Sequence, residues 1–264
     1  MQMHFRRPCV LPFAAALLVL AGCHTVPETG RKSFNMMGAG EEMQLGFSEF
    51  EKMKKEVPIS MDPAVNALVK KVGQEIAAVA PLPGAQWEFV VFDSKEANAF
   101  CLPGGKVGVY TGILPVTKDE AGMATVIGHE VAHAVARHGG ERMSRAMAVQ
   151  GVGTIASAAL GASDYANYGP IFNQAYGAGA QIGVALPHSR AQESEADRMG
   201  LIDMARAGYD PAKSVEFWQR FADYNRQRGG DAGAWFLRTH PLDEQRIADI
   251  RKHLPEAQAQ YRPK

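Results

Sequence analysis

Two histidines and a glutamate stand in a pattern that could hold a metal ion and use it for hydrolysis, His129-Glu130-Val131-Ala132-His133. On a helix, residues four apart lie on one face, so both imidazoles can reach one ion. Glu130 would point toward the open coordination position and act as a catalytic general base. The flanking residues are mainly apolar, which predicts a buried helix where unpaired histidines beside a carboxylate would be costly. The pattern therefore predicts a HExxH metal site with His129 and His133 as ligands.

A catalytic zinc ion needs a third protein ligand and a free position. The metzincin class would place a histidine six residues after His133, but that residue is Gly139, which excludes this class. A glutamate from a second helix can serve instead, and the segment Glu193-Ser194-Glu195-Ala196-Asp197 supplies one. Glu193 is the expected ligand. Asp197, one turn further on, is expected to accept the free N–H of a ligand histidine and to fix its tautomer.

A divalent metal ion, one per chain, is the cofactor expected for mixed imidazole and carboxylate ligands, and Zn²⁺ is one ion that suits them. It would polarise the scissile carbonyl and lower the pKa of water to about 7, and Glu130 would take the proton of the attacking water. An extended peptide would pair through its backbone with an edge strand, a mode that reads conformation more than side chains. This mode predicts unfolded or misassembled protein substrates. The expected edge strand and substrate-binding residues are Lys106, Val107, Gly108, Val109 and Tyr110.

The elements that must position these residues predict a mainly helical α+β fold with one small sheet. Capping residues predict where helices begin, and a run of β-branched and aromatic residues predicts the first strand. Helices are expected from Asp62-Pro63 to about Ala80, from a Thr117–Glu120 capping box to Gly139-Gly140, from Ser189 to Gly208, from Asp210-Pro211 to Gly229-Gly230, and from Pro241; strands are expected over 87–92 and 106–110. His138 is expected at a helix C-terminus, and Glu195 is a weaker ligand candidate than Glu193. Small residues predict a loosely packed helix or flap over 151–162 and a lid or loop over 163–186.

The first 22 residues are expected to be a signal peptide rather than part of the fold. Arg6 and Arg7 precede an apolar stretch over 10–21, which is too short to span a bilayer as a mature helix. The tetrapeptide Leu20-Ala21-Gly22-Cys23 resembles a bacterial lipobox. This resemblance implies lipidation of Cys23 and a protein anchored to a membrane outside the cytoplasm.

The residues after the signal peptide predict a tether and one domain. His24, rather than an aspartate, follows the lipobox cysteine, and this pattern implies the outer membrane. Residues 23–40 are polar and contain Pro27 and Gly30, so they are expected to form a lipidated tether. The single metallopeptidase domain is expected over 41–264.

Charge and cysteine content limit the partners and the crosslinks of the chain. Lys plus Arg and Asp plus Glu number 28 each, so no summed positive field favours nucleic acid, and no nucleic-acid partner is expected. Cys9 would be lost with the signal peptide and Cys23 would carry lipid, which leaves Cys101 without a partner for an intramolecular disulfide.

The motifs together resemble one known family, the HExxH zinc metallopeptidases (gluzincins) that include HtpX and the CAAX prenyl protease. The resemblance covers about Thr29 to Ile250 and implies a zincin-like metallopeptidase domain with a small β-sheet before the HExxH helix. It also implies that the metal is Zn²⁺, one ion per chain. Cys101 stands where alanine is more usual in the family. The segments that carry the resemblance are His129-Glu130-Val131-Ala132-His133-Ala134, Arg137-His138, Ser189-Arg190, Glu193, Ala196-Asp197 and the stretch from Asn98 to Gly112.

Within the family, the lipobox and Thr29-Gly30-Arg31 resemble the periplasmic lipoprotein branch of LoiP, YcaL and BepA. In that branch a histidine before proline approaches the zinc, and Thr239-His240-Pro241 matches this position, while Arg246 matches a nearby arginine. The resemblance implies that His240 either blocks the fourth coordination position in a latent state or stabilises the transition state. From the residues alone, a helix-capping histidine at the surface is the other interpretation.

The resemblance implies an endopeptidase on the periplasmic face of the outer membrane that degrades unfolded or misassembled envelope proteins. The outer-membrane assembly machinery is a further expected partner. The alternative is a noncatalytic zinc-containing lipoprotein that acts as a chaperone or scaffold in outer-membrane assembly. Glu130 argues against this alternative because a structural site needs no general base, whereas His240 as a permanent fourth ligand would favour it.

Overall fold

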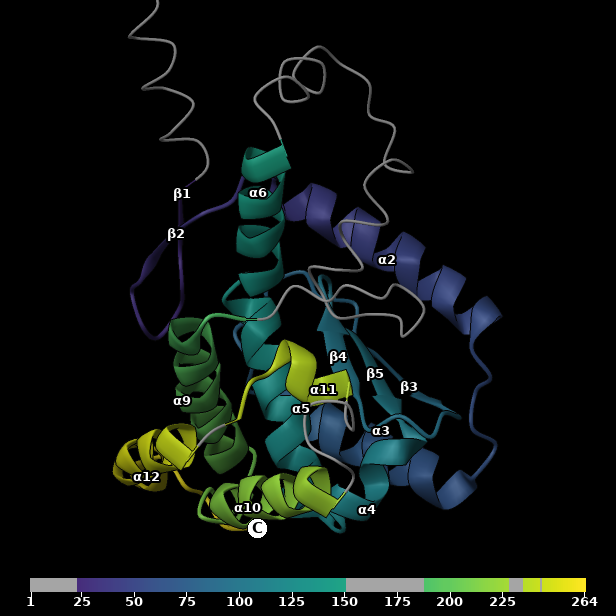
Figure 1. Cartoon of the computed structure of the whole chain (residues 1–264), viewed down its shortest axis with the longest axis vertical. Helices are drawn as coiled ribbons and strands as arrows, with labels where there is room; N and C mark the ends of the chain where they lie inside the picture. Colours follow the sequence, from purple (N-terminus) through teal and green to yellow (C-terminus); the bar gives the residue numbers. More distant parts are fainter. Residues whose placement is uncertain (1–22, 151–187, 228–234, 243) are drawn as a thin grey trace, which may run out of the picture.

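The computed structural model of the chain describes residues 23–150, 188–227, 235–242 and 244–264. The expected signal peptide over 1–22 and the flap and lid expected over 151–186 lie outside the described residues. The rest forms a mainly helical α+β fold with two small sheets, as Figure 1 shows.

The larger sheet has three strands, β3 (Glu88–Phe92), β4 (Ala99–Leu102) and β5 (Lys106–Tyr110). Their order is β3-β5-β4, with β5 parallel to β3 and antiparallel to β4. The two strands predicted from sequence are confirmed. The prediction that 106–110 is an edge strand is wrong, because β4 pairs with the side of β5 that was expected to be free.

Alternation along the strands separates two hydrophobic layers. Val107 and Val109 point to the side of α3 (Pro63–Ala77) and α5 (Glu120–Val135), whereas Tyr110 points to the side of α2 (Ala39–Glu56). Gly108 faces the α2 side, where a Cβ atom would lie only 2.3 Å from Cζ of Phe100. The aromatic layer on this side therefore needs glycine in the central strand.

Short elements connect the sheet to the motif helix. After β5 come the 3₁₀ helix η1 (Thr111–Ile113) and α4 (Leu114–Thr117), and then α5. The N-cap of α5 is Asp119, whose carboxylate accepts from Gly122 N at 2.8 Å, rather than Thr117. The helix also ends earlier than predicted. Arg137 adopts a left-handed conformation with φ 55°, so the chain turns into α6 (His138–Gln150) directly after the motif.

Helices from the second half of the chain pack around α5. They are α9 (Arg190–Arg206), α10 (Lys213–Gln227), the short α11 (Trp235–Thr239) and α12 (Glu244–Ala259), and α9 lies directly against α5 while α12 lies against α9 (Figure 1). Ser189 caps α9 as predicted and forms a capping box with Gln192. At the α5–α9 crossing two glycines meet, and a Cβ atom on Gly200 would lie 2.9 Å from the backbone of Gly128.

The prediction of a tether over residues 23–40 is wrong. Strands β1 (Cys23–Thr25) and β2 (Lys32–Phe34) form an antiparallel hairpin, and α2 already begins at Ala39. Val26 in the hairpin is only 1% exposed. The composition of the segment does not predict the hairpin, because its charged side chains have ionic partners on α6 and α9 that lie far away in the sequence.

Candidate metal centre

Helix α5 places the motif side chains inside the molecule. His129 is 2% exposed, Glu130 4% and His133 5%. The Nε2 atoms of the two histidines lie 3.0 Å apart. The four-residue spacing thus brings both ring nitrogens to one point, as predicted.

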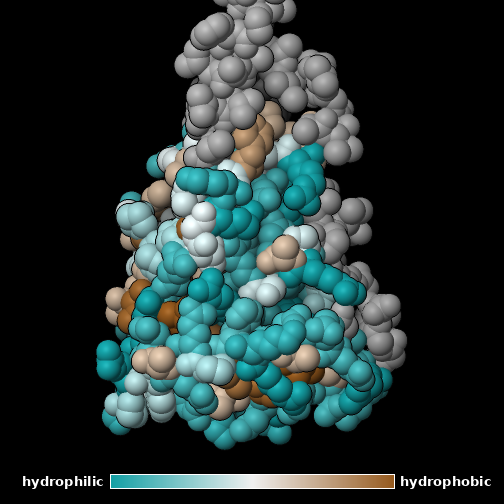
Figure 2. Space-filling view, turned by 90° about the vertical axis from the view of Figure 1, so that its left-hand side faces the viewer, coloured by the Kyte–Doolittle hydropathy of each residue, from teal (hydrophilic) through white to brown (hydrophobic). Residues whose placement is uncertain are grey.

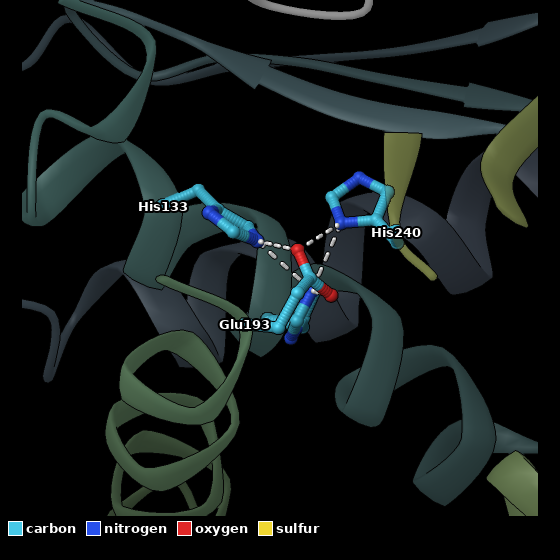
Figure 3. Close-up of side chains that lie close together, drawn as sticks. His133, Glu193 and His240 are labelled. Carbon is cyan, nitrogen blue, oxygen red and sulfur yellow. Dashed lines mark hydrogen bonds and ion pairs between the residues drawn. The ribbon is translucent and has the colours of Figure 1, made fainter. Parts of the chain in front are cut away.

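Helix α9 brings Glu193 to the same point. Its Oε1 atom lies 3.3 Å from Nε2 of His133, and its Oε2 atom lies 3.6 Å from Nε2 of His129. Figure 3 shows the Glu193 carboxylate between the imidazoles of His133 and His240. The third ligand that the sequence predicts is therefore close to the other two, although about 60 residues separate them in the chain.

His240 follows α11 and supplies a third ring nitrogen, as the fourth side chain of the cluster. Its Nδ1 atom lies 3.1 Å from Oε1 of Glu193 and 3.2 Å from Nε2 of His129, while its Nε2 atom lies 3.4 Å from Oε1 of Glu130. Phe236 stacks on the ring at 4.2 Å between centroids, and the His240 amide donates to Phe236 O at 2.8 Å. The side chain is buried, so it is not the surface histidine of the alternative interpretation.

The four side chains fit a tetrahedral metal site. One ligand atom from each of His129, His133, Glu193 and His240 lies within 4.8 Å of all the others. The contacts between them are 3.0 to 3.6 Å, close to the separation of about 3.4 Å between donors that are each about 2.1 Å from one tetrahedral ion. Three imidazole nitrogens that face one another at this distance repel unless a proton or a cation lies between them. The donor set therefore suits a divalent metal of the zinc type.

Asp197 on α9 and Arg246 on α12 support the site behind His129. Oδ1 of Asp197 lies 3.0 Å from Nδ1 of His129, the nitrogen that points away from the donor cluster. Arg246 donates to both Asp197 oxygens at 2.9 Å and lies 2.5 Å from Oε2 of Glu193. Burial acts to raise the pKa of Asp197, but Arg246 and His129 lower it below its usual range. The aspartate is thus held as a carboxylate that can fix the His129 tautomer.

Glu130 is the carboxyl group of the site that lacks such support. Burial raises its pKa to about 8, with His129 opposing and Glu193 adding to the shift. Among the described residues, its carboxylate has an ionic contact with Nε2 of His240, 3.4 Å from Oε1. A carboxyl group in this environment can accept and release a proton near neutral pH, which is what a general acid–base residue needs.

A second polar cluster, which sequence reasoning missed, lies behind His133. The Nδ1 atom of His133 is 2.8 Å from Nδ1 of His138, and Nε2 of His138 is 2.9 Å from Oε2 of Glu195. Burial acts to raise the pKa of Glu195, but hydrogen bonds from His138, Thr29 and Arg31 lower this pKa to about 2. Glu195 thus points to His138 rather than to the metal ligands. The sequence signal that could have indicated this cluster is the dipeptide Arg137-His138, which follows the HExxH motif closely.

The predicted substrate-binding strand does not have the predicted geometry. Residues 106–110 form the central strand β5, whose backbone pairs with β3 on one side and β4 on the other. A peptide cannot add to a strand that is paired on both sides. The outer edges of this sheet belong to β3 and β4. Cys101 in β4 is buried and free, and burial raises the pKa of its thiol.

A buried HExxH helix, a glutamate ligand on a second helix and a small sheet beside them define a zincin-like metallohydrolase. Residues 63–254 match the family model described as Peptidase family M48. The chain belongs to this family.

Relatives carry the same activity in their names. The chain is 35% identical to the mitochondrial metalloendopeptidase OMA1 of Schizosaccharomyces pombe over 236 residues, 88% of this chain and 67% of the relative. It is 38% identical to the Saccharomyces cerevisiae OMA1 over 68% of this chain and 50% of the relative, and 28% identical to the β-barrel assembly-enhancing protease of Escherichia coli over 86% and 46%. The chain thus spans two thirds of the first relative and about half of the other two. Family and relatives together identify it as a metalloendopeptidase.

The described surface gives no sign of a spanning segment. Among the residues that the structure describes, no helix is both long and apolar enough to cross a membrane. The face in Figure 2 is mainly hydrophilic, with hydrophobic side chains in small separate patches.

Proposed function

We propose that the chain is a zinc-dependent endopeptidase that degrades unfolded or misassembled proteins of the bacterial envelope. The observation that carries this proposal is the convergence of His129, His133 and Glu193 on one point, with Glu130 beside it. The mixed imidazole and carboxylate donors favour Zn²⁺. The envelope role draws on the signal-like N-terminus and on the name of the Escherichia coli relative.

The side chains divide the chemistry between them. Bound Zn²⁺ would supply Lewis acidity, which polarises a peptide carbonyl and lowers the pKa of water. Glu130 takes the proton of the attacking water and gives it to the leaving amine. Asp197 keeps the Nδ1 proton of His129 in place, so that Nε2 remains a ligand atom.

His240 is proposed to keep this site latent. Its Nδ1 atom lies among the ligand atoms and its Nε2 atom faces Glu130, so its ring stands where an attacking water would lie. Movement of the α11–His240 segment would open the position. We expect His240→Ala to cleave unfolded casein at least several-fold faster than wild type at equal metal content. A large loss of activity in His240→Ala would instead assign the residue to transition-state stabilisation.

Cys23 is proposed to carry the lipid that anchors the protein to the periplasmic face of the outer membrane. The support is the tetrapeptide Leu20-Ala21-Gly22-Cys23, which resembles a lipobox, and two acyl chains suffice for stable anchoring. Cells that express the full chain should incorporate labelled fatty acid into wild type and not into Cys23→Ala. Labelling of neither protein, together with recovery of wild type in the soluble fraction, would contradict the anchor.

A noncatalytic scaffold for outer-membrane assembly is the second candidate, because His240 could close the site as a permanent fourth ligand. The two candidates differ in their response to substrate. The proposed protease should digest an unfolded outer-membrane β-barrel protein, stop when zinc is chelated and resume when zinc returns. It should spare the same protein once folded in detergent. Full zinc occupancy with no digestion by wild type or His240→Ala would favour the scaffold.

A further inference from the structure

A chain of hydrogen bonds leads from the N-terminal hairpin to the ligand His133. The Nε2 atom of His133 faces Glu193 at 3.3 Å, so its Nδ1 atom points away from the metal ligands. That Nδ1 atom lies 2.8 Å from Nδ1 of His138, which is completely buried. On its other side His138 reaches Oε2 of Glu195 at 2.9 Å.

The positions of the protons follow from the donors and acceptors. If Nε2 of His133 offers its lone pair to a metal, the neutral ring carries its proton on Nδ1 and donates it to Nδ1 of His138. The single proton of neutral His138 then lies on Nε2 and is donated to Glu195. A carboxylate only accepts, so this direction of the chain satisfies every group.

The N-terminal hairpin holds the last member of this chain. Arg31 Nε donates to Oε2 of Glu195 at 2.7 Å, and the Thr29 hydroxyl donates to its Oε1 atom. The other end of the Arg31 guanidinium donates to Glu141 on α6 at 3.1 Å. The hairpin therefore ties α9 to α6 at the carboxylate that receives the His138 proton.

A shorter arrangement of a related kind lies beside the other ligand histidine. There Asp197 lies against Nδ1 of His129, and Arg246 holds both oxygens of Asp197. The outer nitrogen of His129 thus faces a carboxylate directly, whereas that of His133 reaches one through His138. An arginine holds each of the two carboxylates.

We propose that His138 and Glu195 are positioning residues for His133, and that the hairpin residues Thr29 and Arg31 complete this support of the metal site. The inference rests on the proposed function in one respect, namely that a metal ion is bound. It predicts that a change in the hairpin weakens metal binding, although Arg31 itself touches no metal ligand.

The test is the rate at which a chromophoric chelator removes zinc from the purified protein, together with the visible spectrum of the Co²⁺ form. Arg31→Met and His138→Leu should each release metal about 10- to 100-fold faster than wild type and change the Co²⁺ spectrum. His138→Asn should recover much of the loss, because its side-chain oxygen can replace the Nδ1 acceptor of His138. Should His138→Leu fail to fold, Arg31→Met and Thr29→Val decide.

Arg206→Met is the matched control. It removes the ion pair of the same hairpin with Glu28 and leaves Thr29, Arg31 and Glu195 in place. Its release rate and spectrum should equal those of wild type. The inference would be overturned if Arg31→Met and Thr29→Val release metal at the rate of wild type. It would also be overturned if Arg206→Met releases metal as fast as Arg31→Met. A wild type that binds no metal would refute the proposed function, and this inference with it.

Discussion

Two aspartates on α9 occupy opposite electrostatic environments. Asp197 is held by Arg246 and His129, whereas Asp203 is fully buried and neither of its oxygens has a hydrogen-bond partner among the described residues. The nearest guanidinium nitrogen, on Arg206, is 4.0 Å away. Burial, with a contribution from Glu28, raises the pKa of Asp203 to about 7. This carboxyl group is therefore mainly neutral below about pH 7 in the folded protein.

Asp203 should make the protein less stable as pH rises. Its folded pKa is above its ordinary value of 3.8, so the folded state binds this proton more tightly and the free energy of unfolding falls between about pH 4 and pH 7. We expect Asp203→Asn to be more stable than wild type by roughly 2 kcal/mol at pH 8 and nearly equal to it at pH 4. Urea unfolding at both pH values measures this. Asp223→Asn, on the exposed part of α10, is the control, and a pH-independent difference for Asp203→Asn would contradict the assignment.

The meeting of side chains at the candidate metal centre could be predicted where it depends on local spacing. His129, Glu130 and His133 follow from one helical turn, and Glu193 with Asp197 follows from another. His138 was missed for a physical reason. It turns back toward His133 because Arg137 adopts a left-handed conformation, and an arginine does not predict this conformation. Ion pairs of Arg137 with Glu42 on α2 accompany this turn, and the partner lies 95 residues away.

At the scale of elements, the contact between α5 and α9 sets the distance between the ligands that they carry. The two helices touch through backbone at Gly128 and Gly200. A Cβ atom at Gly200 would lie 2.9 Å from backbone atoms, which cannot move aside as a flexible side chain can. The close approach therefore needs glycine at this crossing.

Gly200→Ala should separate the two helices and loosen the metal site. We expect a loss of about 1–3 kcal/mol in the free energy of unfolding, together with weaker zinc binding, because Glu193 moves away from His129 and His133. Gly40→Ala in α2 is the matched control, since nothing lies within 4 Å of its Cβ position. It should keep or slightly raise stability. Normal zinc affinity in a stably folded Gly200→Ala would show that this crossing does not set the site.

Prediction of the elements was good where boundaries have local signals. Asp62 caps α3, Ser189 caps α9, and β5 has the predicted bounds. Among the elements that were missed, two depend on distant partners. The four buried residues of β4 show no alternation and become a strand by pairing with β5, and the N-terminal hairpin depends on carboxylates of α6 and α9.

At the scale of the whole molecule, the metal site is a buried concentration of charge. Glu130, Glu193, Asp197 and Arg246 lie in the interior with three histidines at the meeting point of α5, α9 and α12. Buried charges are costly unless they are paired or coordinate a metal. The ion should therefore contribute to folding as well as to catalysis.

Metal removal should lower the melting temperature of the entire domain. Binding to the folded state alone stabilises it by about 2.7 kcal/mol when free zinc is 100 times the dissociation constant. We expect a chelator to lower the melting temperature by several degrees and added zinc to restore it. His133→Ala should start from a lower melting temperature and respond little to either reagent. Equal melting of the wild type with zinc and with chelator would contradict a metal bound in the interior.

The central claim is that Glu130 performs proton transfer at a metal site built by three other side chains. The direct measurement is cleavage of unfolded casein by wild type, His240→Ala and Glu130→Gln, with zinc content determined on the same samples. The account predicts one zinc per chain in all three proteins, cleavage by wild type that increases in His240→Ala, and a loss of at least 100-fold in Glu130→Gln. Cleavage by Glu130→Gln at the rate of wild type, or zinc-loaded wild type and His240→Ala that both fail to cleave, would contradict it.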